Sequence, residues 1–390
     1  MARLARLRQR PVVLLLVAVL VAGAGVAVTV TMIPDPPQPA TETVMIDMPA
    51  GPDGTGQVRL DATVYRPAAI PAPAVLVAHG FGGSKDSVSA EAAELARRGF
   101  VVLAWTARGF GASGGQIGLN SPDYEVADAR RLVDWLAERP DVVRDGPGDP
   151  RVGVTGASYG GALALLLAGT DPRVDALVPQ ITWNDLAQAL FPNAASRQPV
   201  PAATPAPGAF APDGVFKREW AGQFFGSGAD GSAVCGRFRS EVCAAYSQAA
   251  ITGAPTPQIR ALLRRSSPSA VTGNITAPTL LIQGERDTLF GLDQADATAR
   301  QLAAAGAPLK VVWYAGGHDG GELGGQLREQ IGTWFDYHLR RVGEDPGTGF
   351  EYQVQGAFGT RRGFAQRTVT VPAYPGLDGA GVQRRELSLR

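Results

Sequence analysis

The chain has 390 residues, 45% of them hydrophobic, which is enough to bury the core of one large domain. Lysine plus arginine and aspartate plus glutamate number 36 each, so the net charge gives no indication of a nucleic-acid partner. The three histidines all lie far from the two cysteines in the sequence, and we predict no metal site.

The N-terminal segment, residues 1–33, combines an arginine-rich start with an uncharged apolar run over residues 11–33. A run of this length can span a bilayer as a helix, with the basic end in the cytoplasm. The alternative is a signal peptide cleaved near the small residues 22–24. We favour an uncleaved membrane anchor because the apolar run continues past that position. A Pro-rich linker follows over residues 34–41, and on either reading the rest of the chain lies outside the cytoplasm.

Strand and helix patterns alternate over residues 42–342. In chain order they predict a hairpin over 43–50 and 57–68, a strand over 74–80, a helix over 87–98, a strand over 100–105, a helix from 121 to about 140, a strand over 151–155, a helix over 162–169, strands over 174–182 and 278–284, a helix over 293–305, a strand over 309–316 and a last helix to about 341. The alternation predicts an α/β fold with a mainly parallel, twisted sheet covered by helices on both faces. Ligands of such sheets bind at the carboxyl ends of the strands.

Two serines lie in the pattern Gly-x-Ser-x-Gly, which is typical of serine hydrolase nucleophiles. Ser158, in GASYGG, stands directly between a predicted strand and a predicted helix, and its glycine neighbours leave room for the sharp turn that a nucleophile needs. Ser113, in GASGG, follows its strand at a distance and no helix begins there. We therefore predict Ser158 as the nucleophile.

A serine nucleophile needs a general base and an acid that orients it. His318, in AGGHDGG after the last strand, is the predicted base, whereas His79 closes a strand before the nucleophile and His338 falls on an apolar helical face. Asp287, in GERDTLF, is the predicted acid because it gives the chain order Ser, Asp, His. Glu285 and Asp185 are the alternatives for the acid.

Backbone N–H groups stabilise the oxyanion in such sites. The predicted donors are the N–H of Tyr159, which follows the nucleophile, and the N–H of Phe81 in HGFGG.

Cys235 and Cys243 lie close together in the sequence, in a region with few strand or helix signals. Outside the cytoplasm, a disulfide between them would stabilise the fold by about 2–3 kcal/mol. Two unpaired thiols are the alternative.

The motifs HGFGG, GASYGG, GERDTLF and GGHDGG, in this order, resemble those of an α/β-hydrolase over residues 42–342. Within that fold, ARGFGASGG and the segment before Asp287 are similar to the X-prolyl dipeptidyl-peptidase and cocaine-esterase-like group. The resemblance implies hydrolysis of an amide or ester through an acyl-serine intermediate, with no metal or organic cofactor. Two features depart from the group: HGFGG stands where a tyrosine side chain often supplies an oxyanion donor, and residues 343–390 are too few for the group's β-rich domain. They are predicted to form a short β-rich extension, either a remnant of that domain or an addition to the edge of the main sheet.

Residues 183–274 are the predicted cap over the site. Its aromatic side chains, among them Trp183, Phe191 and Trp220, are candidates for a substrate pocket, although such residues also form a cap's own core. Asp185 is a further pocket candidate, since with Glu219 it could hold a substrate's amino group.

Three functions stay open. An exported peptidase of the dipeptidyl-peptidase type is the main one, and a carboxylesterase acting on small acyl esters is the first alternative. The second is a catalytically silent binding protein with the same fold. The partner is a small ester or peptide in the first two cases, and the oligomeric state is not predicted.

Overall fold

The computed structural model describes residues 13–15, 30–32, 38–192, 214–228, 235–321, 324–359, 363–375 and 377. The chain divides into two units, residues 1–39 and 40–390. In the first unit, strands β1 (Val13–Leu15) and β2 (Val30–Met32) pair antiparallel. These described residues of the apolar run are extended rather than helical, in line with the strand preference of valine and threonine. The rest of the predicted anchor or signal peptide lies outside the described residues, and among the described helices none is long and apolar enough to cross a membrane.

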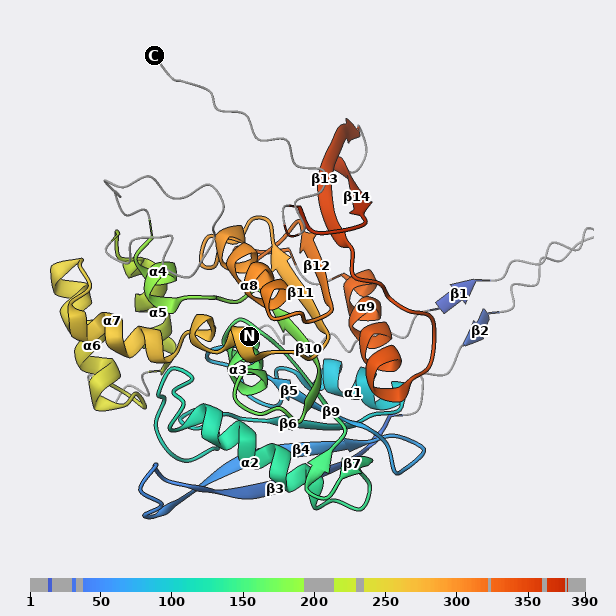
Figure 1. Ribbon diagram of the computed structural model, residues 1–390, viewed down its shortest axis with the longest axis horizontal. Helices are drawn as coiled ribbons and strands as arrows, with labels where there is room; N and C mark the ends of the chain where they lie inside the picture. The colour runs from blue at the N-terminus through green and yellow to red at the C-terminus, as the bar shows by residue number, and fades with distance from the viewer. Residues whose placement is uncertain are drawn as a thin grey trace, which may run out of the picture. The chain divides into compact units, whose positions relative to one another are not determined.

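The second unit is built on one ten-stranded sheet (Figure 1). Its strands are parallel from β13 to β6 in spatial order, and antiparallel pairs form both edges. In spatial order the strands are β14 (Gly363–Val371), β13 (Phe350–Gly359), β12 (Leu309–Tyr314), β11 (Thr279–Gly284), β10 (Val174–Gln180), β9 (Val152–Ala157), β5 (Ala74–Ala78), β6 (Val101–Trp105), β4 (Gln57–Arg66) and β3 (Ala40–Pro49). The mainly parallel, twisted sheet predicted from the alternating pattern is confirmed.

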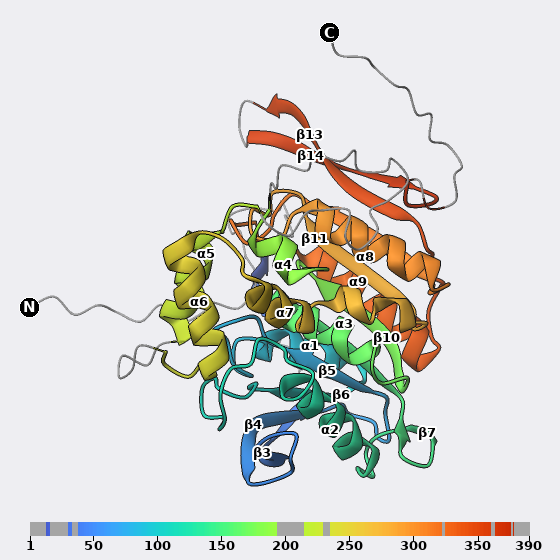
Figure 2. The ribbon, with the colours of Figure 1, turned by 60° about the vertical axis from the view of Figure 1, so that its left-hand side comes forward.

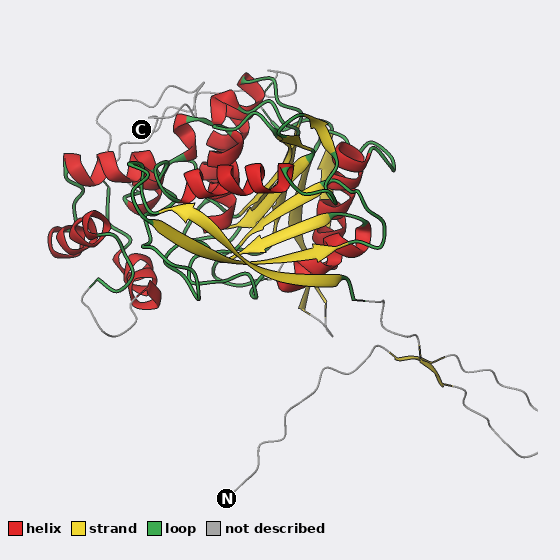
Figure 3. Ribbon diagram, turned by 90° about the horizontal axis from the view of Figure 1, so that it is seen from below, coloured by secondary structure: helices red, strands yellow, loops and turns green. Residues whose placement is uncertain are grey.

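Helices cover both faces of the sheet, as Figure 3 shows. Helices α2 (Glu125–Ala137), α3 (Tyr159–Ala168) and α8 (Leu292–Ala304) pack on one face. Helices α1 (Ser89–Arg98) and α9 (Gly325–Phe335), the latter continuing into the π-helical turn η3 (Asp336–Arg340), pack on the other. A small separate pair, β7 (Arg144–Gly146) and β8 (Asp149–Pro150), precedes β9.

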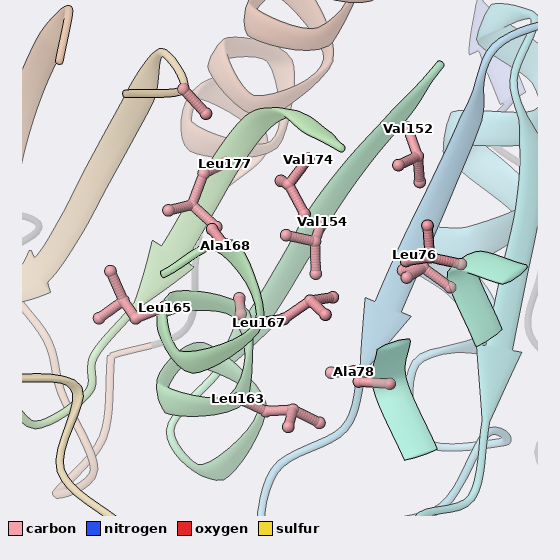
Figure 4. Packing of buried hydrophobic residues seen from close by; sticks show 14 of the residues in the cluster. Leu76, Ala78, Val152, Val154, Leu163, Leu165, Leu167, Ala168, Val174 and Leu177 are labelled. Carbon is pink, nitrogen blue, oxygen red and sulfur yellow. The ribbon is translucent and has the colours of Figure 1, made fainter. Parts of the chain in front are cut away.

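The central strands are apolar on both faces because both faces are covered. In β5, Leu76 and Ala78 belong to the core on the α3 side, whereas Val75 and Val77 belong to the core on the α1 side. Figure 4 shows Leu163 of α3 on the same side of the sheet as Leu76 and Ala78. The nearly continuous apolar sequence of these strands is thus a direct consequence of their central position.

The predicted cap, residues 183–274, lies in the sequence between β10 and β11, and its described helices gather at one end of the unit (Figures 1 and 2). Its described elements are α4 (Leu186–Leu190), α5 (Arg218–Gly228), α6 (Ser240–Thr252), α7 (Pro257–Arg265) and the short turns η1 (Pro268–Ala270) and η2 (Thr272–Asn274). Cys235 and Cys243 form a disulfide that joins the start of α6 to the preceding loop.

The C-terminal extension adds to the edge of the main sheet. Strand β13 pairs parallel with β12, and β14 pairs antiparallel with β13. Tyr374 then packs edge-on against Trp313 and Phe350. The described part of residues 343–390 therefore extends the sheet of the larger unit.

Candidate active site

Ser158 lies on a sharp turn between β9 and α3, with backbone angles φ 56° and ψ −114°. Its N–H donates to the carbonyl oxygen of Gln180, 2.9 Å away, which ties the turn to the neighbouring strand. A Cβ atom on Gly156 would lie 2.7 Å from the Ala78 carbonyl oxygen, and one on Gly161 would lie 2.7 Å from that of Gln180. The glycines of GASYGG are thus required by close backbone approach, which presents Ser158 at the carboxyl end of the sheet.

Ser113 has a different role. Its side chain is buried, donates a 2.6 Å hydrogen bond to the Thr106 carbonyl oxygen and accepts one of 2.9 Å from the Asp61 N–H. Both bonding capacities of the hydroxyl are used to hold a loop against β4, so this serine is structural.

Asp287 and His318 leave the sheet at the same edge, because Gly284 at the end of β11 pairs with Tyr314 at the end of β12. The Nδ1 atom of His318 lies 2.6 Å from Oδ2 of Asp287. The Asp287 side chain is fully buried, and its Oδ1 accepts hydrogen bonds from the N–H groups of Leu289 and Phe290 at 3.0 and 2.8 Å. The Asp287 carboxylate is therefore held in place, and its hydrogen bond to Nδ1 orients the imidazole ring.

The opposite nitrogen of His318, Nε2, is buried and has no hydrogen-bond partner among the described residues. The imidazole ring packs edge-on against Phe290, with ring centroids 5.3 Å apart. Phe290 and Ser158 line the same pocket. His318 thus lies next to the pocket that contains Ser158, with the nitrogen that a general base uses left available.

The other two histidines are structural. Nε2 of His79 accepts a 2.9 Å hydrogen bond from the Ala107 N–H, which leaves Nδ1 to donate to the Gly80 carbonyl oxygen at 2.7 Å. Burial lowers the pKa of His79, so it stays neutral and links two loops. His338, on the turn η3, is partly buried and packs on Trp334 of α9, with ring centroids 4.3 Å apart.

The two alternative acids also have structural partners. Asp185 is the N-cap of α4, where its side chain accepts a hydrogen bond from the Gln188 N–H at 3.0 Å. Glu285 accepts a 2.8 Å hydrogen bond from the Gln353 N–H on β13. His318 is bonded to Asp287 and to neither of these.

The two predicted oxyanion donors belong to residues that line the same pocket as Ser158. Tyr159 is the first residue of α3, and the first N–H groups of a helix have no partner within the helix. Phe81 lies in a tight turn closed by a 3.0 Å hydrogen bond from the Gly83 N–H to the Gly80 carbonyl oxygen. The Phe81 and Tyr159 rings meet edge-on at 5.4 Å. Their N–H groups as oxyanion donors remain a prediction.

An apolar pocket opens beside Ser158, with about 760 Å³ of empty space, part of it open to solvent. No charged side chain of the described residues lines this pocket. Its lining is Phe81, Leu119, Ser158, Tyr159, Trp183, Leu186, Leu190, Phe191, Phe216, Ala221, Phe224, Phe225, Phe238, Val242, Ala245, Tyr246, Ala249, Ile259, Leu262, Leu263 and Phe290.

The predicted pocket residues are only partly brought together. Trp183 and Phe191 line the pocket, but Asp185 does not, because capping α4 directs its carboxylate to backbone N–H groups. Trp220 does not line it either: its Nε1 donates to Thr288 Oγ1 at 3.3 Å, and its ring lies edge-on to His318 at 6.0 Å. A substrate contact of Asp185 or Trp220 stays a prediction.

A group of hydrogen bonds around Thr288 was not predicted from the sequence. Asp319, next to His318, accepts hydrogen bonds from the N–H and Oγ1 of Thr288, both at 2.8 Å. Nζ of Lys217, from the cap, donates to the carbonyl oxygens of Thr288 and Leu289 at 2.7 and 2.6 Å. These bonds hold the Asp287 and His318 loops together. In the sequence, the only indication of this contact is that Thr288 and Asp319 directly follow the predicted acid and base.

Two carboxyl groups on the helices that cover the sheet have raised pKa values. Burial raises the pKa of Glu91, on α1, and of Glu125, on α2, to about 7 in each case. In the part of the chain that the structure describes, no group of three or more acidic, histidine or cysteine side chains is placed to hold a metal ion.

These carboxyl groups predict the pH dependence of stability. A group with a raised pKa binds more protons in the folded protein than in the unfolded chain, so the free energy of unfolding falls as pH rises. For Glu125 we expect a loss of up to about 3 kcal/mol between about pH 4.5 and 7. Urea unfolding between about pH 4.5 and 7 measures this slope, and Glu125→Gln should make it shallower; the same slope in the wild type and the variant would contradict the raised pKa of Glu125.

Comparison with solved structures gives the class of protein. A CocE/NonD family hydrolase from Staphylococcus aureus matches with a TM-score of 0.59 and 15% identity, over 86% of this chain and 56% of that one. The acylaminoacyl peptidase of Pyrococcus horikoshii matches with 0.51 and 17%, over 79% and 43%. A 2,6-dihydroxy-pseudo-oxynicotine hydrolase matches with 0.53 and 18%, over 80% and 71%. The protein has the α/β-hydrolase fold.

The sequence then defines the family. Residues 53–319, more than half of the chain, match the X-Pro dipeptidyl-peptidase (S15) family. The chain belongs to that family. The predicted resemblance is confirmed.

Curated relatives match shorter segments. An uncharacterized protein of Pseudomonas aeruginosa is 37% identical over 114 residues, which is 29% of each chain. The quorum-quenching protein AidA of Acinetobacter baumannii is 31% identical over 134 residues, or 34% of this chain and 42% of that protein. The chain thus spans less than half the length of these relatives.

Proposed function

We propose that the chain transfers an apolar acyl group from an ester or amide to Ser158 and then to water. His318 serves as general base and Asp287 orients it. The observation that carries the proposal is the buried 2.6 Å contact between Asp287 Oδ2 and His318 Nδ1, which leaves Nε2 free beside the pocket that Ser158 lines.

The chemistry proceeds in two balanced steps. Oγ of Ser158 attacks the substrate carbonyl carbon while its proton passes to Nε2 of His318, and the carbonyl π electrons move onto oxygen. The N–H groups of Phe81 and Tyr159 stabilise that oxyanion. When the carbonyl re-forms, the leaving alcohol or amine departs with the proton from His318. Water, deprotonated by His318, then attacks the acyl-serine and releases the carboxylic acid.

The lining of the pocket supports an uncharged acyl group. An X-Pro dipeptidyl-peptidase must hold the free ammonium group of its substrate, and burying that charge without a partner is costly. The family match favours such a peptidase, but Asp185 caps α4 and Glu219 lies exposed on α5. Among the described residues, the pocket offers apolar and aromatic surface instead, which favours ester substrates with hydrophobic acyl chains.

A substrate comparison tests this proposal. We expect p-nitrophenyl octanoate to be hydrolysed with a higher kcat/KM than p-nitrophenyl acetate, since each buried methylene contributes about 0.8 kcal/mol. Ala-Pro p-nitroanilide should be a poor substrate. Turnover of the dipeptidyl amide in preference to both esters would overturn the acyl-pocket proposal in favour of the peptidase.

Filling the pocket should change this preference. Ala245 of α6 lines the pocket, and Ala245→Phe should lower kcat/KM for the octanoyl ester by about tenfold, equivalent to about 1.4 kcal/mol, with little effect on the acetyl ester. Ala244→Phe, at the adjacent exposed position of the same helix, is the matched control. Equal losses with both esters would show that Ala245 does not contact the acyl chain.

Export of the enzyme is part of the proposal. The arginine-rich start and the apolar run over residues 11–33 support targeting out of the cytoplasm, with retention as an anchor or removal as a signal peptide. The disulfide between Cys235 and Cys243 also supports an oxidising compartment. Mass spectrometry of the mature N-terminus, after cell fractionation, distinguishes the two fates.

A further inference from the structure

The loop before α2 has an unusual backbone. Leu119 and Asn120 are consecutive non-glycine residues in the left-handed region, with φ of 61° and 57°. Side chains rarely adopt this conformation, and it persists only where surrounding contacts impose it. Leu119 lines the pocket beside Ser158. The conformation of this loop therefore sets part of the pocket wall.

Glu125 supplies the contacts that impose this conformation. Its side chain is buried at the start of α2, where Oε1 accepts from the Gly118 N–H and Oε2 accepts from the Ser121 N–H at 2.9 Å. One carboxylate thus bonds the backbone on both sides of the two left-handed residues. The neighbouring Asp128 is held by both Arg108 Nε and Arg108 Nη2 at 2.6 Å, so that ion pair is complete without Glu125.

Tyr159 is bound to the same group. Its hydroxyl donates to Glu125 Oε1 at 3.2 Å and accepts from the Asn120 N–H at 2.9 Å. The Asn120 side-chain amide donates to the Tyr159 carbonyl oxygen at 2.8 Å. Both the side chain and the main chain of Tyr159 are therefore fixed by the loop that Glu125 holds.

We propose that Glu125 is a positioning residue of the active site, which holds the Tyr159 N–H toward the oxyanion and Leu119 in the pocket wall. It contacts no reacting atom and acts through the Tyr159 hydroxyl and the backbone of residues 118–121. The inference rests on the proposed function, in which Tyr159 is an oxyanion donor. Protonation or replacement of the carboxylate removes an acceptor that backbone N–H groups require. Burial raises the pKa of Glu125 because it desolvates the charged form. The hydrogen bonds from surrounding backbone N–H groups act in the opposite direction, because they favour the ionised carboxylate.

Two variants test the proposal. Glu125→Gln replaces one acceptor oxygen with a donor, and Tyr159→Phe removes only the hydroxyl and leaves the backbone N–H. With active sites counted by complete fluorophosphonate labelling, we expect each variant to lower kcat per labelled site by about tenfold and to change KM for p-nitrophenyl octanoate by less than about twofold. Because Glu125 and the Tyr159 hydroxyl share a hydrogen bond and hold the same loop, the losses in the double variant should be less than additive.

The controls separate the possible outcomes. Asp175→Asn is the matched carboxyl-to-amide change, since Asp175 accepts from the Val152 N–H at the start of β9, the end opposite Ser158. It should leave kcat per labelled site unchanged. Losses explained entirely by fewer labelled sites, or additive losses in the double variant, would overturn the positioning role. Should Glu125→Gln fail to fold, Tyr159→Phe alone still decides by its effect on kcat. Failure of the proposed function is distinct, because the wild-type protein would then not be labelled at Ser158.

Discussion

Replacing Ser158 with alanine should abolish ester hydrolysis, with kcat falling by at least about 10⁴-fold. The Ser158 hydroxyl lies on the sharp turn, whereas the hydroxyl of the adjacent Tyr159 is buried and hydrogen-bonded to Glu125 and Asn120. Stability should change by less than about 1 kcal/mol, since alanine keeps the backbone and removes only the oxygen. Steady-state kinetics and labelling with a fluorophosphonate measure the loss of activity, and urea unfolding measures the change in stability; no adduct should form in the variant.

Ser113→Ala is the matched control because Ser113 lies in the second Gly-x-Ser-x-Gly pattern. It should cost about 1–3 kcal/mol of stability, since the Asp61 N–H and the Thr106 carbonyl lose a buried partner. Its folded fraction should keep wild-type kcat. Activity that survives in Ser158→Ala and disappears in Ser113→Ala would reverse the assignment of the nucleophile. A wild-type protein that forms no adduct would instead favour the catalytically silent alternative.

The second large effect is expected from Asp287→Asn, which should lower kcat by about 10⁴-fold. Oδ2 of Asp287 accepts from the ring of His318 at 2.6 Å and from its backbone N–H at 3.2 Å. An amide nitrogen at that position donates instead of accepting, so the imidazole turns to the tautomer that protonates Nε2 and loses its capacity as a base. The Oδ1 bonds to Leu289 and Phe290 persist, which keeps the loop folded. Steady-state kinetics with p-nitrophenyl octanoate measure the loss.

Glu285→Gln and Asp185→Asn are the controls for this prediction. Glu285 bonds β13, and Asp185 caps α4, so neither change reaches the imidazole. Both variants should keep kcat within about threefold of wild type. An Asp287→Asn enzyme with normal kcat, or a large loss in either control, would show that another carboxylate orients His318.

The turn at Ser158 was predictable because its cause is local. GASYGG places three glycines where the backbones of Ala78 and Gln180 approach, and that steric requirement is written in the motif itself. The contact between Asp287 and His318 was also predictable, since residues that follow adjacent parallel strands meet at one edge of a sheet. The fold class followed from the alternation of strands and helices, and the family followed from the motifs around these residues.

Other features of the site could not be predicted from the sequence. Asp185 and Trp220 were assigned to the pocket from composition, whereas their directions are set by an N-cap and by a hydrogen bond to Thr288. Leu119 and Glu125 gave no signal because neither the left-handed backbone at Leu119 and Asn120 nor the hydrogen bonds from Glu125 to this loop follow a recognised sequence motif. The anchor or signal peptide stays a prediction, since most of the apolar run lies outside the described residues.

The insertion of the cap between β10 and β11 has an evolutionary consequence. The proposed nucleophile, acid and base all come from loops at the strand ends, while the pocket wall comes largely from the one inserted segment. Mutations in that segment can retune which molecules are accepted without disturbing how the bond is broken. Replacing the segment between β10 and β11 with that of another hydrolase is therefore a practical way to change substrate selectivity while the catalytic residues stay the same.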